Sequence, residues 1–199
     1  HCGTSSIIYS SFIENDHKVF VYEPQINMYN LLVKNINQNH LQDQIIPTNS
    51  GVFCYEGFGK MNNIDLDGGG GIVSKRYETE NNLQCNFGGI GLGKDGEFIK
   101  LTTIDNMKLK NIGFIHCDAQ GSENFIFSSG LETIKRERPV IFYENNEIHG
   151  KYLYNNVCNS YPNYKKESKF DIKKFCMEEL QYSTFIDKFN DSIDTILIP

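Results

Sequence analysis

Carboxylates follow apolar segments in the second half of the chain, at positions where a buried strand would end. Asp118 follows the run FIHC, and Glu123 comes soon after Gly121. Glu144 ends a further run, RPVIFYE. Ionised carboxylates avoid burial unless a partner offsets the cost, so a core strand gains nothing from an acid at its tip. Because carboxylates bind metal ions and accept protons from hydroxyls, Asp118 and Glu144 are candidate catalytic or metal-binding residues.

A second group of polar residues lies in the first quarter of the chain. The opening stretch HCGTSS contains Gly3 and Ser5, and a glycine there lets the backbone approach a ligand closely. Glu23 follows the run VFVY about 20 residues after Gly3, where an acid can accept hydrogen bonds from both hydroxyls of a ribose. Asn49 and Ser50 follow the segment QIIPT. Ligands of open α/β sheets bind outside the carboxyl ends of the strands, so these residues predict a ligand site.

The hydrophobic pattern predicts the elements that position these residues. Runs of β-branched and aromatic residues indicate strands, and apolar residues at helical spacing indicate helices. Strands are predicted at 17–24, 44–53, 97–105, 112–118, 138–144 and 194–199, and helices within 3–15, 27–39, 122–137 and 171–186, with a break or cap at Gly130. This alternation predicts an α/β fold with a mostly parallel central sheet and helices on both faces.

The length of 199 residues suits a single domain, 1–199. Residues 56–97 are rich in Gly and Asn with weak periodicity, and predict hairpins and loops inserted at the rim of the sheet. The opening HCGTSS reads as a loop whose preceding strand is missing. We therefore expect a domain of a longer chain.

Composition excludes some classes of partner. The net charge of -6 argues against a nucleic-acid surface, which needs clustered Lys and Arg. No apolar run approaches the roughly 20 residues that span a membrane. The six cysteines form no CxxC pair, which favours buried reduced thiols and a cytoplasmic protein. The abundance of Asn, Ile and Lys is typical of an AT-rich genome, such as that of a large virus, in which case the host cytoplasm is expected.

Several motifs in this order resemble the FkbM-type methyltransferase family. The segments VYEP, TTID, CDAQGSE and RPVIFYE match the family pattern in order and spacing over most of the chain. The sequence departs from the pattern in the first loop, where His1 and Ile7 replace an acid and a glycine, and at His116 and Gln120. The resemblance implies a Rossmann-like class I fold that binds S-adenosyl-L-methionine (SAM) and transfers a methyl group to a hydroxyl, often of a sugar or glycan.

The resemblance also implies roles for the candidate residues. Asp118 would lie near the transferred methyl group and act as a base, with His116 as the second candidate, and Glu144 would lie beside the acceptor. A divalent cation held by Asp118 and Glu144 is a further expectation. The cofactor-binding residues implied are Gly3, Ser5, Glu23, Asn49, Ser50 and Asp118. The acceptor, a small molecule or glycan, would be contacted by segments 56–97 and 145–170, where Tyr152, Tyr154, Tyr161 and Tyr164 are candidates for stacking on a sugar ring.

Three other interpretations stay open. The altered first loop is compatible with a non-catalytic domain that keeps the fold for binding, because fold does not guarantee activity. The sequence DLD at Asp65 to Asp67 resembles a metal-binding motif of glycosyltransferases, which favours a nucleotide-sugar glycosyltransferase. Separately, fusion of this domain to a glycosyltransferase domain is expected. A nicotinamide-dependent enzyme fits Gly3 and Glu23 but lacks the G-x-G-x-x-G sequence.

Overall fold

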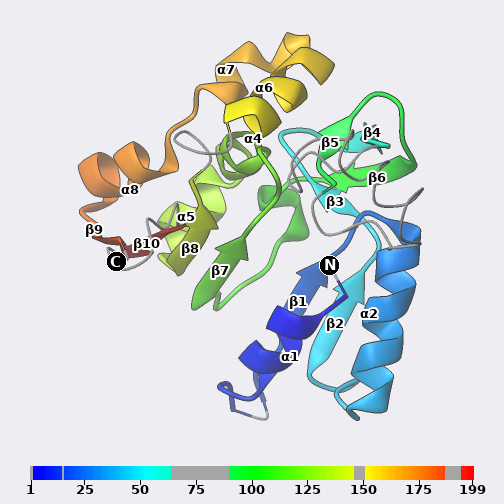
Figure 1. Cartoon of the computed structure of the whole chain (residues 1–199). Helices are drawn as coiled ribbons and strands as arrows, with labels where there is room; N and C mark the ends of the chain where they lie inside the picture. The colour runs from blue at the N-terminus through cyan, green and yellow to red at the C-terminus, as the bar shows by residue number, and fades with distance from the viewer. Residues whose placement is uncertain (1, 15, 64–89, 146–150, 187–193) are drawn as a thin grey trace.

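A computed structural model describes residues 2–14, 16–63, 90–145, 151–186 and 194–199, with α-helices, short 3-10 turns and three sheets in these ranges (Figure 1). The N-terminal part is built from α1 (Thr4–Ser10), β1 (Val19–Tyr22), α2 (Ile26–Gln38) and β2 (Ile45–Thr48). β1 and β2 pair in parallel. Ile45 of β2 is fully buried and belongs to the same hydrophobic cluster as Leu32 and Ile36 of α2. The helix α2 buries Met28, Leu32 and Ile36, whose spacing places them on one face.

The second sheet has the strand order β7-β8-β10-β9. Its strands are β7 (Phe114–Cys117), β8 (Val140–Glu144), β9 (Ser183–Ile186) and β10 (Asp194–Ile198). β7 and β8 are parallel, whereas β10 is antiparallel to both of its neighbours. The helices α4 (Glu123–Ser128), α5 (Leu131–Glu137) and α8 (Ile172–Leu180) contribute to the same hydrophobic core, which includes the fully buried Ile134, Ile141 and Leu197.

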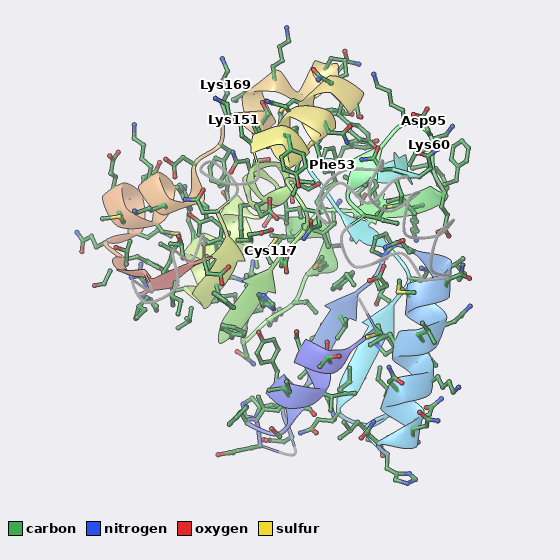
Figure 2. All side chains as sticks on the ribbon, viewed as in Figure 1. Phe53, Lys60, Asp95, Cys117, Lys151 and Lys169 are labelled. Atoms are coloured by element: carbon green, nitrogen blue, oxygen red, sulfur yellow. The ribbon has the colours of Figure 1, made fainter. Side chains whose placement is uncertain are left out.

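The third sheet has the order β3-β6-β4-β5, with β3 (Gly51–Val52), β4 (Gly57–Met61), β5 (Leu92–Gly93) and β6 (Phe98–Thr102). The helix α6 (Lys151–Ser160) packs beside β5, where the Asn156 side chain donates a hydrogen bond to the Leu92 carbonyl at 3.1 Å. Phe53, labelled in Figure 2, joins this sheet to α4. Its ring stacks on Phe125 with a centroid distance of 4.8 Å, and both residues are fully buried. The 3-10 turns Asp105–Met107 and Pro162–Tyr164 and the short helix α7 (Lys165–Ser168) complete the described elements.

The prediction of a mostly parallel central sheet is not confirmed, since the sheets are mixed. β9 and β10 show the physical reason, because only residues 187–193 separate them. A parallel connection needs a crossover of about a dozen residues or more, so consecutive strands this close in sequence pair antiparallel.

Several predicted elements have different bounds in the structure. The strand predicted at 44–53 is divided at Asn49 and Ser50 into β2 and β3, which belong to different sheets. The helix predicted at 171–186 ends at Leu180, after which Gln181 takes a left-handed φ of 59° and β9 begins. The break at Gly130 is confirmed, since α4 and α5 meet there. The helices α6 and α7 had no predicted counterpart.

Within the described residues, β1 pairs only with β2 and β7 only with β8, so each leaves one edge unpaired. Figure 1 shows the two pairs of strands apart, with α1 near the space between them. A strand preceding the first loop stays a prediction, and most of the 56–97 segment, including Asp65 and Asp67, lies outside the described residues. Among the described helices, none is long and apolar enough to cross a membrane.

Candidate active site

The turn after β7 carries the acid–glycine–acid pattern of the sequence. Asp118 is exposed directly after the strand, Gln120 and Gly121 follow with φ of 55° and 90°, and Glu123 begins α4. Glu123 is only 4% exposed, and its Oε1 accepts a hydrogen bond from the Ala119 N–H at 2.7 Å. A carboxylate that closes its own turn in this way holds Asp118 in a defined place at the end of the sheet.

Three carboxylates come together at the carboxyl ends of β7 and β8. Oxygen atoms of Asp118, Glu123 and Glu144 all lie within 4.8 Å of one another. The Gln120 side-chain amide donates a hydrogen bond to Asp118 Oδ1 at 3.0 Å. The structure therefore brings together Asp118 and Glu144, as the sequence predicted, and adds Glu123. The sequence signal for Glu123 was its position after Gly121, where a left-handed turn can bring the chain back toward Asp118.

A small pocket lies beside this cluster. Its walls include Glu123 and Glu144 together with Tyr143, Asn145 and Tyr154. Tyr154 comes from α6, and its hydroxyl donates a hydrogen bond to the Ser168 carbonyl at 3.1 Å. The pocket thus combines acidic groups with aromatic walls, and its volume of about 20 Å³ admits a group the size of one hydroxyl or one water molecule.

His116 is held from two sides. Its Nδ1 lies 3.0 Å from the Tyr9 hydroxyl of α1, and its ring stacks on Phe142 of β8 with a centroid distance of 4.8 Å. Burial lowers the pKa of His116 from its ordinary value, and the charges of Asp118 and Asp194 offset this in part. The imidazole is therefore mainly neutral at pH 7, a state in which one ring nitrogen can accept a proton.

The polar residues of the first loop and of β1 and β2 form a separate group. Glu23 is 3% exposed, and its carboxylate accepts the Gln25 N–H at 2.9 Å. The Asn49 amide donates to the carbonyls of Glu23 and Pro24. The Ser50 hydroxyl is bonded to the Gly51 and Lys100 carbonyls. Hence Asn49 and Ser50 fix the backbone at the ends of the strands.

Gly3 precedes α1 with a φ of 98°, a conformation that favours glycine. A Cβ at Gly3 would lie 2.6 Å from Leu32 Cδ1, so the glycine lets the first loop pack against α2. Ser5, in the first turn of α1, is exposed. The contact between Tyr9 and His116 links α1 to β7, and β1, β2 and β7 point their carboxyl ends to the same side of the molecule (Figure 1).

The tyrosines considered for ring stacking are packed in different ways. Tyr161 exchanges hydrogen bonds with the backbone of Lys60, and Tyr164 stacks on Tyr55 with centroids 4.8 Å apart. Tyr152 is 46% exposed, whereas Tyr154 lines the pocket. Of the four, Tyr154 is therefore the one that the structure places beside the carboxylate cluster.

Of the cysteines in the described residues, Cys117 and Cys176 are buried, as expected, whereas Cys54 and Cys158 are only partly buried. Burial raises the pKa of the Cys54 thiol from 9.0 to about 12, and the charge of Glu167 adds to the shift. Since the thiolate is the reactive form, Cys54 should alkylate with iodoacetamide at pH 8 roughly 1000-fold more slowly than free cysteine. Its rate should continue to rise above pH 9, where that of free cysteine levels off.

Mass-spectrometric mapping of alkylation at Cys54 against time checks this prediction. A Cys54 rate equal to that of free cysteine at pH 8 would show that the thiol is neither buried nor close to Glu167.

The strands and helices above make a mixed α/β fold that gathers carboxylates at the carboxyl ends of parallel strands, the place where such folds bind ligands. The crystal structure of methyltransferase FkbM from Methylobacillus flagellatus KT has a similar fold, with a TM-score of 0.51 and 13% sequence identity. The similarity covers 91% of this chain and 36% of that chain, so this chain spans about a third of the length of that protein. No family model and no curated protein matches the sequence.

Proposed function

We propose that the chain is a SAM-dependent O-methyltransferase that acts on a hydroxyl of a small molecule of the sugar or glycan class. One observation carries the proposal: a fold similar to that of a methyltransferase places the carboxylates of Asp118, Glu123 and Glu144 beside a pocket with aromatic walls. Methyl transfer to a hydroxyl needs a positioned acceptor oxygen and a group that takes its proton, and this cluster supplies both kinds of contact.

The residues at the ends of β1 and β2 are of the types that would bind SAM. Glu23 supplies a carboxylate for the ribose hydroxyls, and Asn49 holds the backbone on which that carboxylate is mounted. In the proposal, Gly3 and Ser5 line the methionine side and Ser50 supports the adenine side through the backbone that it bonds. When bound, SAM would supply the electrophilic methyl group.

The acceptor would be activated by the residues at the end of β7. Asp118 is exposed and is held by the Gln120 amide, so it can accept a proton without leaving its position. His116 is the second base, since it is mainly neutral at pH 7, although its Nδ1 is already in contact with Tyr9. Glu144 and Asn145 would contact the hydroxyls of the acceptor from the wall of the pocket.

Release of S-adenosylhomocysteine tests the function. The chain is incubated with SAM and a panel of monosaccharides and oligosaccharides, and product is measured with and without each acceptor. We expect release that depends on an acceptor. The proposal would be overturned by a chain that binds SAM but releases no product with any acceptor, or that transfers sugar from a UDP- or GDP-sugar instead.

A non-catalytic methyltransferase-fold domain is the second candidate. The hydrogen bonds of Asn49 and Ser50 to the backbone favour it, because these side chains are satisfied within the protein. In that case SAM would bind weakly or not at all, while the fold would remain intact.

A further inference from the structure

We propose that Asp118, Glu123 and Glu144, together with the side-chain carbonyl of Gln120, bind one hard divalent cation of the Ca²⁺ or Mg²⁺ class. The site is argued from the arrangement of these four side chains. Its role in activating the acceptor hydroxyl rests on the proposed function.

The separation of the carboxylate oxygens fits a single ion. Oxygen atoms of the three acids lie within 4.8 Å of one another. Ca²⁺ takes oxygen ligands at about 2.3–2.6 Å, so two ligands on opposite sides of it lie about 4.6–5.2 Å apart, and the corresponding span for Mg²⁺ is about 4.0–4.2 Å. The three carboxylates are therefore close enough together to contact one Ca²⁺ or Mg²⁺ ion.

The Gln120 side chain is an independent indication of a ligand. It is only 8% exposed, and within the part of the chain that the structure describes its Oε1 is buried with no hydrogen-bond partner. The same amide group donates from Nε2 to Asp118 Oδ1 at 3.0 Å, which places the amide directly against the carboxylate cluster. Buried amide oxygens are normally satisfied, and a side-chain carbonyl is an ordinary ligand for a hard cation.

Two of the ligands are already held in position. Glu123 Oε1 accepts the Ala119 N–H at 2.7 Å, and Asp118 accepts the Gln120 amide. Contacts that orient ligands in this way are the outer layer of a metal site and increase its affinity. The ligand atoms are all oxygen, which favours Ca²⁺, Mg²⁺ or Mn²⁺ over softer metals.

The bound cation would add a specific step to methyl transfer. An acceptor hydroxyl that binds the cation is more acidic than in water, so it loses its proton more easily to the Asp118 carboxylate oxygen that does not bind the cation, and it attacks the methyl group as an alkoxide. The O–H bond breaks, the new C–O bond forms, and the bond from the methyl carbon to sulfur breaks, which leaves a neutral thioether.

Terbium luminescence tests the site without cofactor or acceptor. Tb³⁺ binds the same hard oxygen ligands as Ca²⁺. The chain has no tryptophan, so the nearby tyrosines Tyr143 and Tyr154 in the pocket wall are the side chains that would sensitise Tb³⁺ emission. We expect Tb³⁺ emission that saturates with added Tb³⁺ and is lost when Ca²⁺ or Mg²⁺ displaces the ion. The affinity for Tb³⁺ should fall at least about 10-fold in Asp118→Asn and in Glu123→Gln. The ion that displaces Tb³⁺ at lower concentration identifies the preferred cation.

A matched control lies elsewhere in the chain. Glu14, Asp16 and His17 form a second group with closely spaced ligand atoms, but all three are exposed and Asp16 is paired with His17 at 2.9 Å. Asp16→Asn should leave the emission unchanged. The proposal would be overturned by equal Tb³⁺ emission in the parent chain, Asp118→Asn and Glu123→Gln, or by loss of emission in Asp16→Asn.

The two proposals can fail separately. Absence of Tb³⁺ binding would exclude the cation site and leave methyl transfer with Asp118 as base. Tb³⁺ binding with methyl transfer that is insensitive to a chelator would confirm the site and exclude its role in activating the acceptor.

Discussion

Replacing Asp118 by asparagine should lower the rate of methyl transfer at least about 100-fold, because general bases contribute about 10² to 10⁴ to a rate. Asparagine keeps the shape of the side chain but cannot take a proton from the acceptor hydroxyl. Asp118 is exposed, so the change should leave the fold intact. The loss should therefore appear in kcat, while the thermal unfolding temperature stays within a few degrees of that of the parent chain. S-adenosylhomocysteine release under saturating acceptor measures it.

Asp95→Asn is the matched control for Asp118. It makes the same change at another exposed aspartate, in the turn between β5 and β6, and Figure 2 places Asp95 well away from Cys117, the neighbour of Asp118. The control should keep the parent rate. Equal rates in Asp118→Asn and Asp95→Asn would contradict the assignment of Asp118 as the base.

Replacing Gly121 by alanine should lower the free energy of unfolding by about 3 kcal/mol or more. Gly121 has a φ of 90°, and an added Cβ would lie 2.6 Å from the backbone of Leu153 and Tyr154 in α6. Neither neighbour is the end of a flexible side chain, so α6 must move away from the turn that carries Asp118 and Glu123. For a chain of this size the expected drop in the unfolding temperature is about 6–12 °C.

Gly113→Ala is the control for Gly121→Ala. A Cβ at Gly113 would meet nothing within 4 Å, so this change should be neutral or stabilise the fold slightly by restricting the unfolded chain. Denaturant unfolding of both variants compares them directly. A Gly121→Ala variant as stable as Gly113→Ala would show that α6 is not packed against this turn.

The sequence predicted the elements that carry local signals. Gly130 between two apolar helical segments predicted the division of α4 from α5, and the acids after FIHC and VIFY predicted that Asp118 and Glu144 would meet at the ends of adjacent strands. These signals are local because a glycine cap and a strand end depend on the residues beside them.

The sequence did not predict features that depend on tertiary contacts. The strand expected at 44–53 has apolar residues near both ends, but the polar Asn49 and Ser50 between them bond backbone carbonyls, and the chain passes there into a different sheet. The helix predicted within 122–137 includes Glu123, which begins α4, but the place of Glu123 in the carboxylate cluster depends on the left-handed turn at Gln120 and Gly121. No helix was predicted within 145–170, because the few buried positions of α6, such as Leu153 and Val157, give a weak hydrophobic pattern.

Calorimetric titration with S-adenosylhomocysteine tests the central claim most directly. The comparison uses the parent chain and two variants, Glu23→Gln and Glu97→Gln. Glu97→Gln is the control, because Glu97, like Glu23, accepts a backbone N–H at the start of α2. We predict micromolar binding to the parent chain and to Glu97→Gln, and binding at least about 10-fold weaker in Glu23→Gln, because a charged hydrogen-bond acceptor is lost. No heat of binding at millimolar ligand, or equal affinity in all three proteins, would contradict a cofactor site at the end of β1.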